Sequence, residues 1–177
     1  MTRFIKRHLV VGVCSKELQF ENTPVVCGHD VEDEAAVRYK YFEISSGTQK
    51  FTTKLQTHDS VPKGCIWCNK LIRIAFSLTT DASVKIDEIS ESNLKQISKL
   101  NCIIKFLKEP QESRLNSDDL KHHIIKELNR HCLNVSQSYV IKFKSMLMSL
   151  EIEDILGNYF DFQWMIENEN SFLQISF

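Results

Sequence analysis

The amino-acid sequence predicts a small β-barrel or sandwich followed by a smaller α+β unit. Three observations lead to this prediction. The first part of the chain contains many short runs of β-branched and aromatic residues. A polar stretch without Gly or Pro, EISESNLKQISK, then interrupts these runs, and one helical pattern follows among further strand patterns. We therefore expect two units, residues 1–90 and residues 91–177.

Seven segments of the first unit have the composition of β-strands. Many short strands with little helix are typical of a barrel or a sandwich. Residues 45–49, SSGTQ, have the Gly and Ser content of a hairpin loop. The predicted strands are 8–13, 23–27, 38–45, 49–57, 64–68, 71–78 and 83–90.

The second unit is predicted to contain four strands and one amphipathic helix. Ser117 is the expected N-cap, two aspartates follow it in the first turn, and apolar residues then recur at helical spacing from Leu120 to Leu128. The helix is predicted to end at His131, where a basic Arg-His pair stands. A tight turn is expected at residues 144–145, between the second and third of these strands. The predicted strands are 100–107, 138–143, 146–155 and 172–177.

Composition and charge exclude several classes of protein. Hydrophobic residues make up 42% of the chain and charged residues 25%, which is typical of a soluble globular protein. No apolar run reaches the roughly 18 residues of a transmembrane helix. The apolar run near the N-terminus is too short for a signal peptide, so we expect a cytoplasmic location and reduced cysteines. A formal net charge of −1 argues against a broadly basic nucleic-acid-binding protein.

Cys65 and Cys68 form the motif that most suggests chemistry, in GCIWC. A C-x-x-C pair can be half of a zinc site or a redox couple. The other four cysteines form no second C-x-x-C. A redox pair should lie between a strand and the N-terminus of a helix, whereas both flanks here have strand composition. Packing thiols are therefore the favoured interpretation, and Cys65 and Cys68 are kept as weak metal candidates.

The chain contains no motif for nucleotide hydrolysis or for serine catalysis. Neither G-x-x-x-x-G-K-[ST] nor G-x-S-x-G occurs in it. We therefore expect a chain that is not an enzyme and that holds no cofactor of its own.

Residues 55–64 read LQTHDSVPKG and precede an apolar segment. This phrase resembles L-R-T-H-P-S-V-x-P-G in the amino-terminal domain of the N-ethylmaleimide-sensitive factor (NSF) family, AAA+ ATPases that disassemble SNARE complexes. Arg73 falls where that family has the Arg of Q-R-K-W. The matches follow one another in the same order over nearly the whole chain, and this shared order carries the resemblance. The other matching segments are 14–26, 103–107, 133–143 and 152–155.

The resemblance implies both a fold and a function. The fold is a double-psi β-barrel packed on a small α/β roll. The function is adaptor binding, in which a basic groove receives the acidic end of α-SNAP, and through it SNARE complexes, in vesicle fusion and transport. ATP and Mg²⁺ are expected only on ATPase modules outside this chain. The isolated domain is expected to be a monomer, with hexamers only where those modules are present, and to reach membranes through adaptors without inserting.

The resemblance transfers to individual residues only in part. Ile74 and Ala75 stand where the family has Lys and Trp. Each lost charge-assisted contact should weaken α-SNAP binding by about 1–3 kcal/mol. In the matching strand Cys68 takes the place of a Phe and should point into the barrel. The predicted partner-binding residues are Arg73, Lys70, Lys105, Lys108 and Arg7.

Two alternatives to this function stay open. The amino-terminal domain of valosin-containing protein has the same two-part build and binds ubiquitin-type adaptors, but LQTHDSV argues against it. Some double-psi barrels are decarboxylases that cleave themselves at a Gly-Ser bond. This chain has Ser46-Gly47 but no Gly-Ser, which leaves zinc at Cys65 and Cys68 as the remaining enzymatic possibility.

Overall fold

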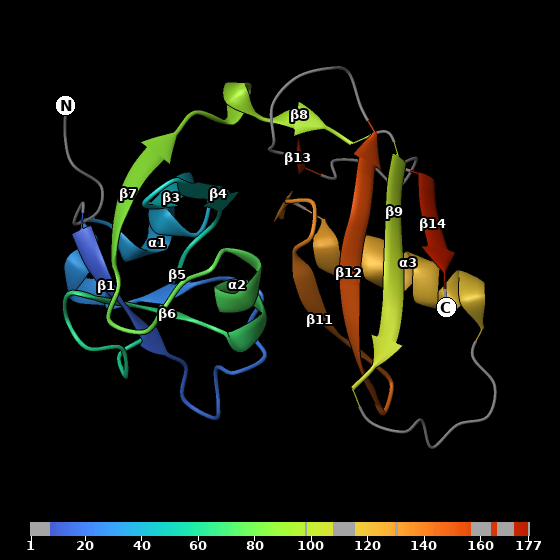
Figure 1. Ribbon diagram of the computed structural model, residues 1–177, viewed down its shortest axis with the longest axis horizontal. Helices are drawn as coiled ribbons and strands as arrows, with labels where there is room; N and C mark the ends of the chain where they lie inside the picture. Colours follow the sequence, from blue (N-terminus) through green and yellow to red (C-terminus); the bar gives the residue numbers. More distant parts are fainter. Residues whose placement is uncertain are drawn as a thin grey trace. The chain divides into compact units, whose positions relative to one another are not determined.

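The computed structural model describes residues 8–97, 99–107, 116–129, 131–156, 164–165 and 172–176, with the backbone alone at 95–96, 156, 164–165 and 172–176. The chain divides into two compact units, Met1–Asn93 and Leu94–Phe177, whereas the sequence predicted a boundary between residues 90 and 91. Both units are mostly β, with few and short helices (Figure 1). No helix in the described part of the chain is long and apolar enough to cross a membrane.

The first unit is built on a curled, mixed sheet of seven strands in the order β4-β3-β7-β1-β6-β2-β5. The pairs β1–β6 and β2–β5 are parallel, and the remaining neighbours are antiparallel. The strands are β1 (His8–Val13), β2 (Val25–Val26), β3 (Tyr41–Ser46), β4 (Gln49–Thr53), β5 (Gln56–Thr57), β6 (Cys65–Cys68) and β7 (Ser83–Ile89).

Period-two alternation along these strands produces the hydrophobic core of the first unit. Alternate side chains of each strand point to the same face of a sheet. Leu9 and Val11 of β1 and Val84 and Ile86 of β7 are all almost fully buried in one cluster, which we call the main core. A second, smaller cluster, which we call the satellite cluster, consists of Leu18, Val25, Cys27 and Val61, with Cys14, Cys65 and Trp67 packed against it.

The segment 71–78, predicted to be a strand, instead contains helix α2 (Lys70–Ala75). The Asn69 side chain caps this helix by accepting a hydrogen bond from the Ile72 backbone N–H at 2.8 Å. Ile72 and Phe76, four residues apart, are buried in the main core, whereas Ile74 between them is 64% exposed. Burial at a spacing of four is helical periodicity, and here it prevails over the strand propensity of the apolar residues.

Other predicted strands also differ from their observed bounds, and β2 retains only Val25–Val26 of the strand predicted at 23–27. Helix α1 (Glu34–Val37), which the sequence did not predict, ends where the strand predicted at 38–45 was to begin, so that β3 starts at Tyr41. The Asp33 side chain caps α1. The strand predicted at 49–57 is divided into β4 and β5. Two short 3-10 helices, η1 (Gly28–Asp30) and η2 (Glu91–Asn93), complete this unit.

The second unit pairs a helix with a sheet in the order β11-β12-β9-β14. The first three strands form an antiparallel arrangement, and β14 pairs with β9 in parallel. Three short strands form a separate small sheet, β10-β13-β8. The elements are β8 (Lys95–Gln96), β9 (Lys99–Phe106), α3 (Ser117–Leu128), β10 (Cys132–Leu133), β11 (Ser138–Phe143), β12 (Met146–Leu156), β13 (Trp164–Met165) and β14 (Phe172–Ser176).

Helix α3 packs along one face of this sheet (Figure 1). Its four buried residues, with the predicted helical spacing, join the hydrophobic cluster of the second unit. The N-cap, however, is Asn116 rather than Ser117, because the Asn116 Oδ1 accepts hydrogen bonds from the backbone of both following aspartates, at 2.9 and 3.3 Å. The helix ends at Leu128, three residues before the predicted end, because Asn129 leaves the helical conformation. Those four residues are Leu120, Ile124, Ile125 and Leu128.

The contact between Gly12 and Trp67 leads to a first prediction. These residues are partners in the parallel β1–β6 pair, and a Cβ at position 12 would lie 2.6 Å from the Trp67 Cδ1. The indole would have to move out of the satellite cluster to make room. We therefore expect Gly12→Ala to lower the free energy of unfolding by about 1–3 kcal/mol in urea titrations.

Gly47 provides the matched control for this prediction. Gly47 has a φ of 58°, and a Cβ added at this position would meet no atom within 4 Å. Only the backbone conformation, and no steric clash, therefore restricts which side chains fit at position 47. Asn tolerates this left-handed conformation, and Gly47→Asn should cost less than about 1 kcal/mol. A loss for Gly12→Ala no larger than that for Gly47→Asn would contradict the packing of Trp67 on Gly12.

Candidate partner-binding site

Asn69 fixes the position of the candidate site at the junction of β6 and α2. Its side chain is almost fully buried and makes two hydrogen bonds in opposite directions. The Oδ1 caps α2 through Ile72, and the Nδ2 donates to the Glu21 carbonyl oxygen at 2.7 Å. Asn69 therefore holds the helix that carries Lys70 and Arg73 against the loop that follows β1. Sequence reasoning missed this residue, although Asn before Lys-Leu-Ile is an N-cap signal.

Arg73 has more hydrogen-bond donors than the described structure satisfies. It is half-buried in the last turn of α2. Its Nη1 donates to the Thr80 Oγ1 at 3.5 Å, which is a long and weak contact. Its Nε is buried and has no hydrogen-bond partner among the described residues. The terminal Nη groups of such a guanidinium can donate hydrogen bonds to a partner's carboxylate without first breaking a strong internal bond.

Lys70 and Ile74 lie beside Arg73 on the outer side of α2. Both are exposed, and residues four apart on a helix lie on the same face. The first turn of α2 contains no acidic residue that would pair with Lys70. The surface formed by Lys70, Arg73 and Ile74, which we call the α2 surface, therefore combines two cations with one exposed apolar side chain.

The remaining predicted cations are placed differently. Lys105 lies on β9, in the second unit, and its Nζ forms an ion pair with the Glu151 Oε2 on β12 at 2.7 Å. Both side chains are substantially exposed, so the pair contributes little to stability, but it offsets the Lys105 charge. Lys108 and Arg7 lie outside the described residues. The structure thus places Lys70 and Arg73 together and leaves Lys105 with a partner of its own.

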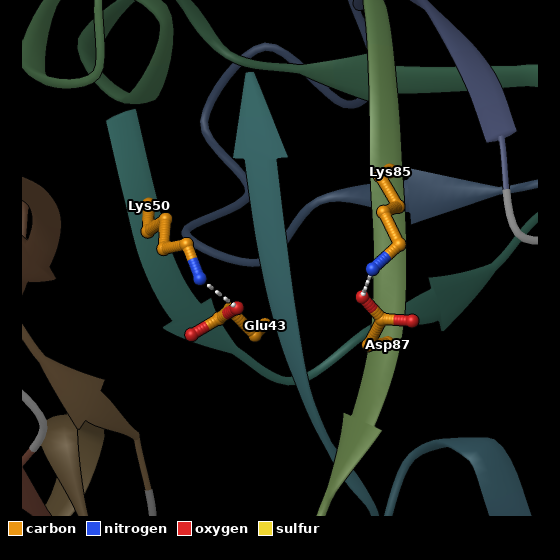
Figure 2. Close-up of polar contacts among 4 residues, drawn as sticks. All are labelled: Glu43, Lys50, Lys85 and Asp87. Carbon is orange, nitrogen blue, oxygen red and sulfur yellow. Dashed lines mark hydrogen bonds and ion pairs between the residues drawn. The ribbon is translucent and has the colours of Figure 1, made fainter. Parts of the chain in front are cut away.

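A second group of lysines lies on the sheet of the first unit and is neutralised by acids. Figure 2 shows Lys50 reaching Glu43 and Lys85 reaching Asp87. The Lys50 Nζ lies 2.9 Å from the Glu43 Oε1, and this hydrogen bond raises the pKa of Lys50. Glu43 and Asp87 are direct partners across β3 and β7, so each lysine also reduces the repulsion between them. This face is balanced in charge, which makes the α2 surface the better candidate for an acidic partner.

Cys65 and Cys68 are separated by the alternation of β6. Cys65 packs against the satellite cluster, whereas Cys68 is 1% exposed and belongs to the main core, which confirms the prediction that it points inward. Burial raises the pKa of Cys68 far above its ordinary value, an effect to which Cys14 adds and which Arg73 opposes. No three His, Cys, Asp or Glu residues in the described part of the chain are placed to hold a metal ion.

A helix, not a strand, follows the C-x-x-C motif, so the predicted strand on that flank is wrong. Helix α2 begins at Lys70, and only its capping residue Asn69 separates it from β6. Both cysteines nevertheless lie within β6, and the capping position at the helix N-terminus belongs to Asn69. What opposes a redox couple of Cys65 with Cys68 is their opposite orientation and the burial of Cys68.

Comparison of the chain with known proteins identified no relative. No protein-family model matches the chain, and no curated protein is detectably similar to it.

A second prediction follows from the two hydrogen bonds of Asn69. Asn69→Ala removes the cap of α2 and leaves the Glu21 carbonyl without this donor. We expect the free energy of unfolding to fall by about 1–3 kcal/mol in urea titrations. Asn116→Ala, which removes an exposed cap of α3, is the matched control and should cost only about 1 kcal/mol. Equal losses in the two variants would mean that the bond to Glu21 contributes nothing.

A third prediction concerns the pH dependence of stability. Burial raises the pKa of the Cys14 thiol from its ordinary 9.0 to about 11, although Arg73 acts in the opposite direction. The unfolded chain therefore loses this proton first. The buried Cys14 thiol therefore contributes its full stabilisation below the pKa that it has in the unfolded chain. This stabilisation is lost as the pH rises from that value through the pKa that Cys14 has in the folded protein. We expect the free energy of unfolding to fall less steeply between these two pKa values in Cys14→Ala than in the wild type. An equal slope in both proteins would rule out this role of Cys14.

Proposed function

We propose that the chain is a non-catalytic, adaptor-binding domain of the type found at the amino terminus of NSF, and that it recruits an acidic adaptor such as α-SNAP with its SNARE complexes. In this proposal the curled sheet of the first unit is a double-psi β-barrel and the second unit is an α/β roll. The parallel pairs β1–β6 and β2–β5 within an otherwise antiparallel sheet fit the crossed connections of such a barrel.

One observation carries the proposal: the segment that resembles NSF leads directly into the α2 surface. Residues 55–64 include β5 and the loop before β6, and α2 begins two residues after Cys68. The motif that suggests the family and Arg73, whose guanidinium has hydrogen-bond donors without partners among the described residues, therefore belong to one continuous stretch of chain. Arg is the side chain best suited to hold a carboxylate, because its planar fork can make two parallel hydrogen bonds.

The loop between β5 and β6 is held by its own polar residues. The His58 Nδ1 contacts the Ser60 Oγ at 2.7 Å and accepts a hydrogen bond from the Ser60 N–H at 3.2 Å. At the other end, the Gly64 N–H donates to the Asp30 Oδ2 at 2.5 Å, and Gly64 has a φ of 84°. The histidine, the serine and the glycine of LQTHDSVPKG thus have structural tasks in this loop, which supports comparing it with the family phrase.

Charge reversal at Arg73 tests the proposal. We expect the wild type to retain α-SNAP bound to SNARE complexes in a pull-down, with weaker binding at higher salt. Arg73→Glu should weaken binding by about 1–3 kcal/mol, the value of one charge-assisted contact. Lys126→Glu makes the same change of charge at an exposed position of α3 and should leave binding unchanged.

Two results would count against this function. Binding that responds neither to salt nor to Arg73→Glu would remove the electrostatic basis of the α2 surface. Retention of ubiquitin-type adaptors in preference to α-SNAP would instead assign the chain to the valosin-containing-protein type of domain.

A further inference from the structure

Cys27 and Cys65 lie opposite each other across the antiparallel strands β2 and β6. The register pairs Val25 with Trp67 and Val26 with Ile66. Cys27 and Cys65 are the next residues along the two strands, just past the last paired residues. The ladder itself ends there, because the Cys65 N–H donates to the Pro62 carbonyl and the Cys27 carbonyl accepts from the Asp30 N–H, both at 3.0 Å. Cys27 still has an extended backbone, with φ −70° and ψ 135°, so the chain continues the direction of β2 through it.

Both thiols also face the same side of the sheet. Cys27 is 5% exposed within the satellite cluster, and the half-buried Cys65 packs against that cluster. Cys68, three residues further along β6, belongs to the main core instead. The C-x-x-C spacing therefore does not identify the partner of Cys65, since a strand turns residues three apart to opposite faces.

The expected separation suits a disulfide bond. Residues directly opposite in an antiparallel pair have Cα atoms about 4.5 or 5.5 Å apart, depending on the hydrogen-bonding pattern. Disulfides form between Cα atoms about 4.4–6.8 Å apart, so either pattern is suitable. All six cysteines are free thiols in this structure.

We propose that Cys27 and Cys65 form an oxidation site, which a low-molecular-weight disulfide such as oxidised glutathione converts into an intramolecular disulfide. This inference stands on the register and packing of β2 and β6, and it does not depend on the proposed function. The modification links the end of β2 to the start of β6, the strand that leads into α2.

The reaction is a two-step thiol–disulfide exchange. The Cys65 thiolate, the more accessible of the two, attacks one sulfur of oxidised glutathione and forms a mixed disulfide, releasing one glutathione thiolate. The Cys27 thiolate then attacks the Cys65 sulfur and releases the second glutathione. The protein dithiol is oxidised and loses two hydrogens, and one oxidised glutathione is reduced to two glutathione molecules.

The disulfide constrains the chain between the two cysteines. The closed loop contains α1, the β3–β4 hairpin and β5. A cross-link that closes a long loop lowers the entropy of the unfolded chain and so stabilises the folded state. We therefore expect the oxidised protein to melt several degrees above the reduced protein, and the difference to disappear after reduction.

Peptide mapping of the whole folded chain tests the proposal. The protein is incubated with oxidised glutathione, its remaining thiols are alkylated, and it is digested without reduction. Trypsin releases Cys27 in peptide 17–38 and both motif cysteines in peptide 64–70, and chymotrypsin then cuts after Trp67 and separates Cys65 from Cys68. The expected product is a linked pair of peptides, lighter by two hydrogens, that contains Cys27 and Cys65.

Two controls show that the fold selects this pair. Cys68→Ser should leave the linked peptides unchanged, whereas Cys65→Ser should abolish them. The same oxidation of the wild type in urea should distribute disulfides over several pairs. If the serine variants fail to fold, the comparison of native with urea-treated wild type decides the question by itself. A native protein that links Cys65 with Cys68, that carries glutathione on Cys65 without closing to Cys27, or that gives the same mixture as the unfolded chain would overturn the proposal.

Discussion

The first unit depends on β6, a strand that is paired on both edges and buried on both faces. It pairs with β1 in parallel and with β2 in antiparallel fashion. Ile66 and Cys68 therefore enter the main core, while Cys65 and Trp67 pack against the satellite cluster. Because side chains alternate along a strand, a shift of one residue would exchange the two clusters. This constraint determines the surroundings of both motif cysteines.

The end of β6 is determined as sharply as its register. Asn69 accepts a hydrogen bond from the Ile72 N–H in the first turn of α2 and donates one to the Glu21 carbonyl, so a single buried amide caps the helix and holds it to a neighbouring loop. The exposed positions of Lys70 and Ile74 and the half-buried position of Arg73 follow from where this helix begins. The arrangement of the α2 surface is therefore a consequence of the cap rather than of the helix's own weak propensity.

Charge alone would not have located that surface. Lysines occur on several strands, and the described structure pairs Lys50, Lys85 and Lys105 with carboxylates on the same or a neighbouring strand. Exposed pairs of this kind stabilise the protein little, but they remove positive charge from the sheet faces. Arg73 differs because its guanidinium has one long hydrogen bond and one buried N–H without a partner among the described residues.

The sequence by itself determined the elements whose signal is local. Strand composition predicted β1, β11 and β12, the Gly47 turn predicted the β3–β4 hairpin, and helical spacing predicted α3 to within three residues of its end. Asn69 carries a local N-cap signal for α2, but the tertiary structure decided that the apolar run after it is a helix, because such a run becomes helix or strand according to which side chains a core can bury. The tertiary structure also decided which cysteine lies near Cys65. Sequence spacing suggested Cys68, but alternation turns that thiol to the main core, whereas Cys27, 38 positions earlier in the sequence, shares the satellite cluster with Cys65.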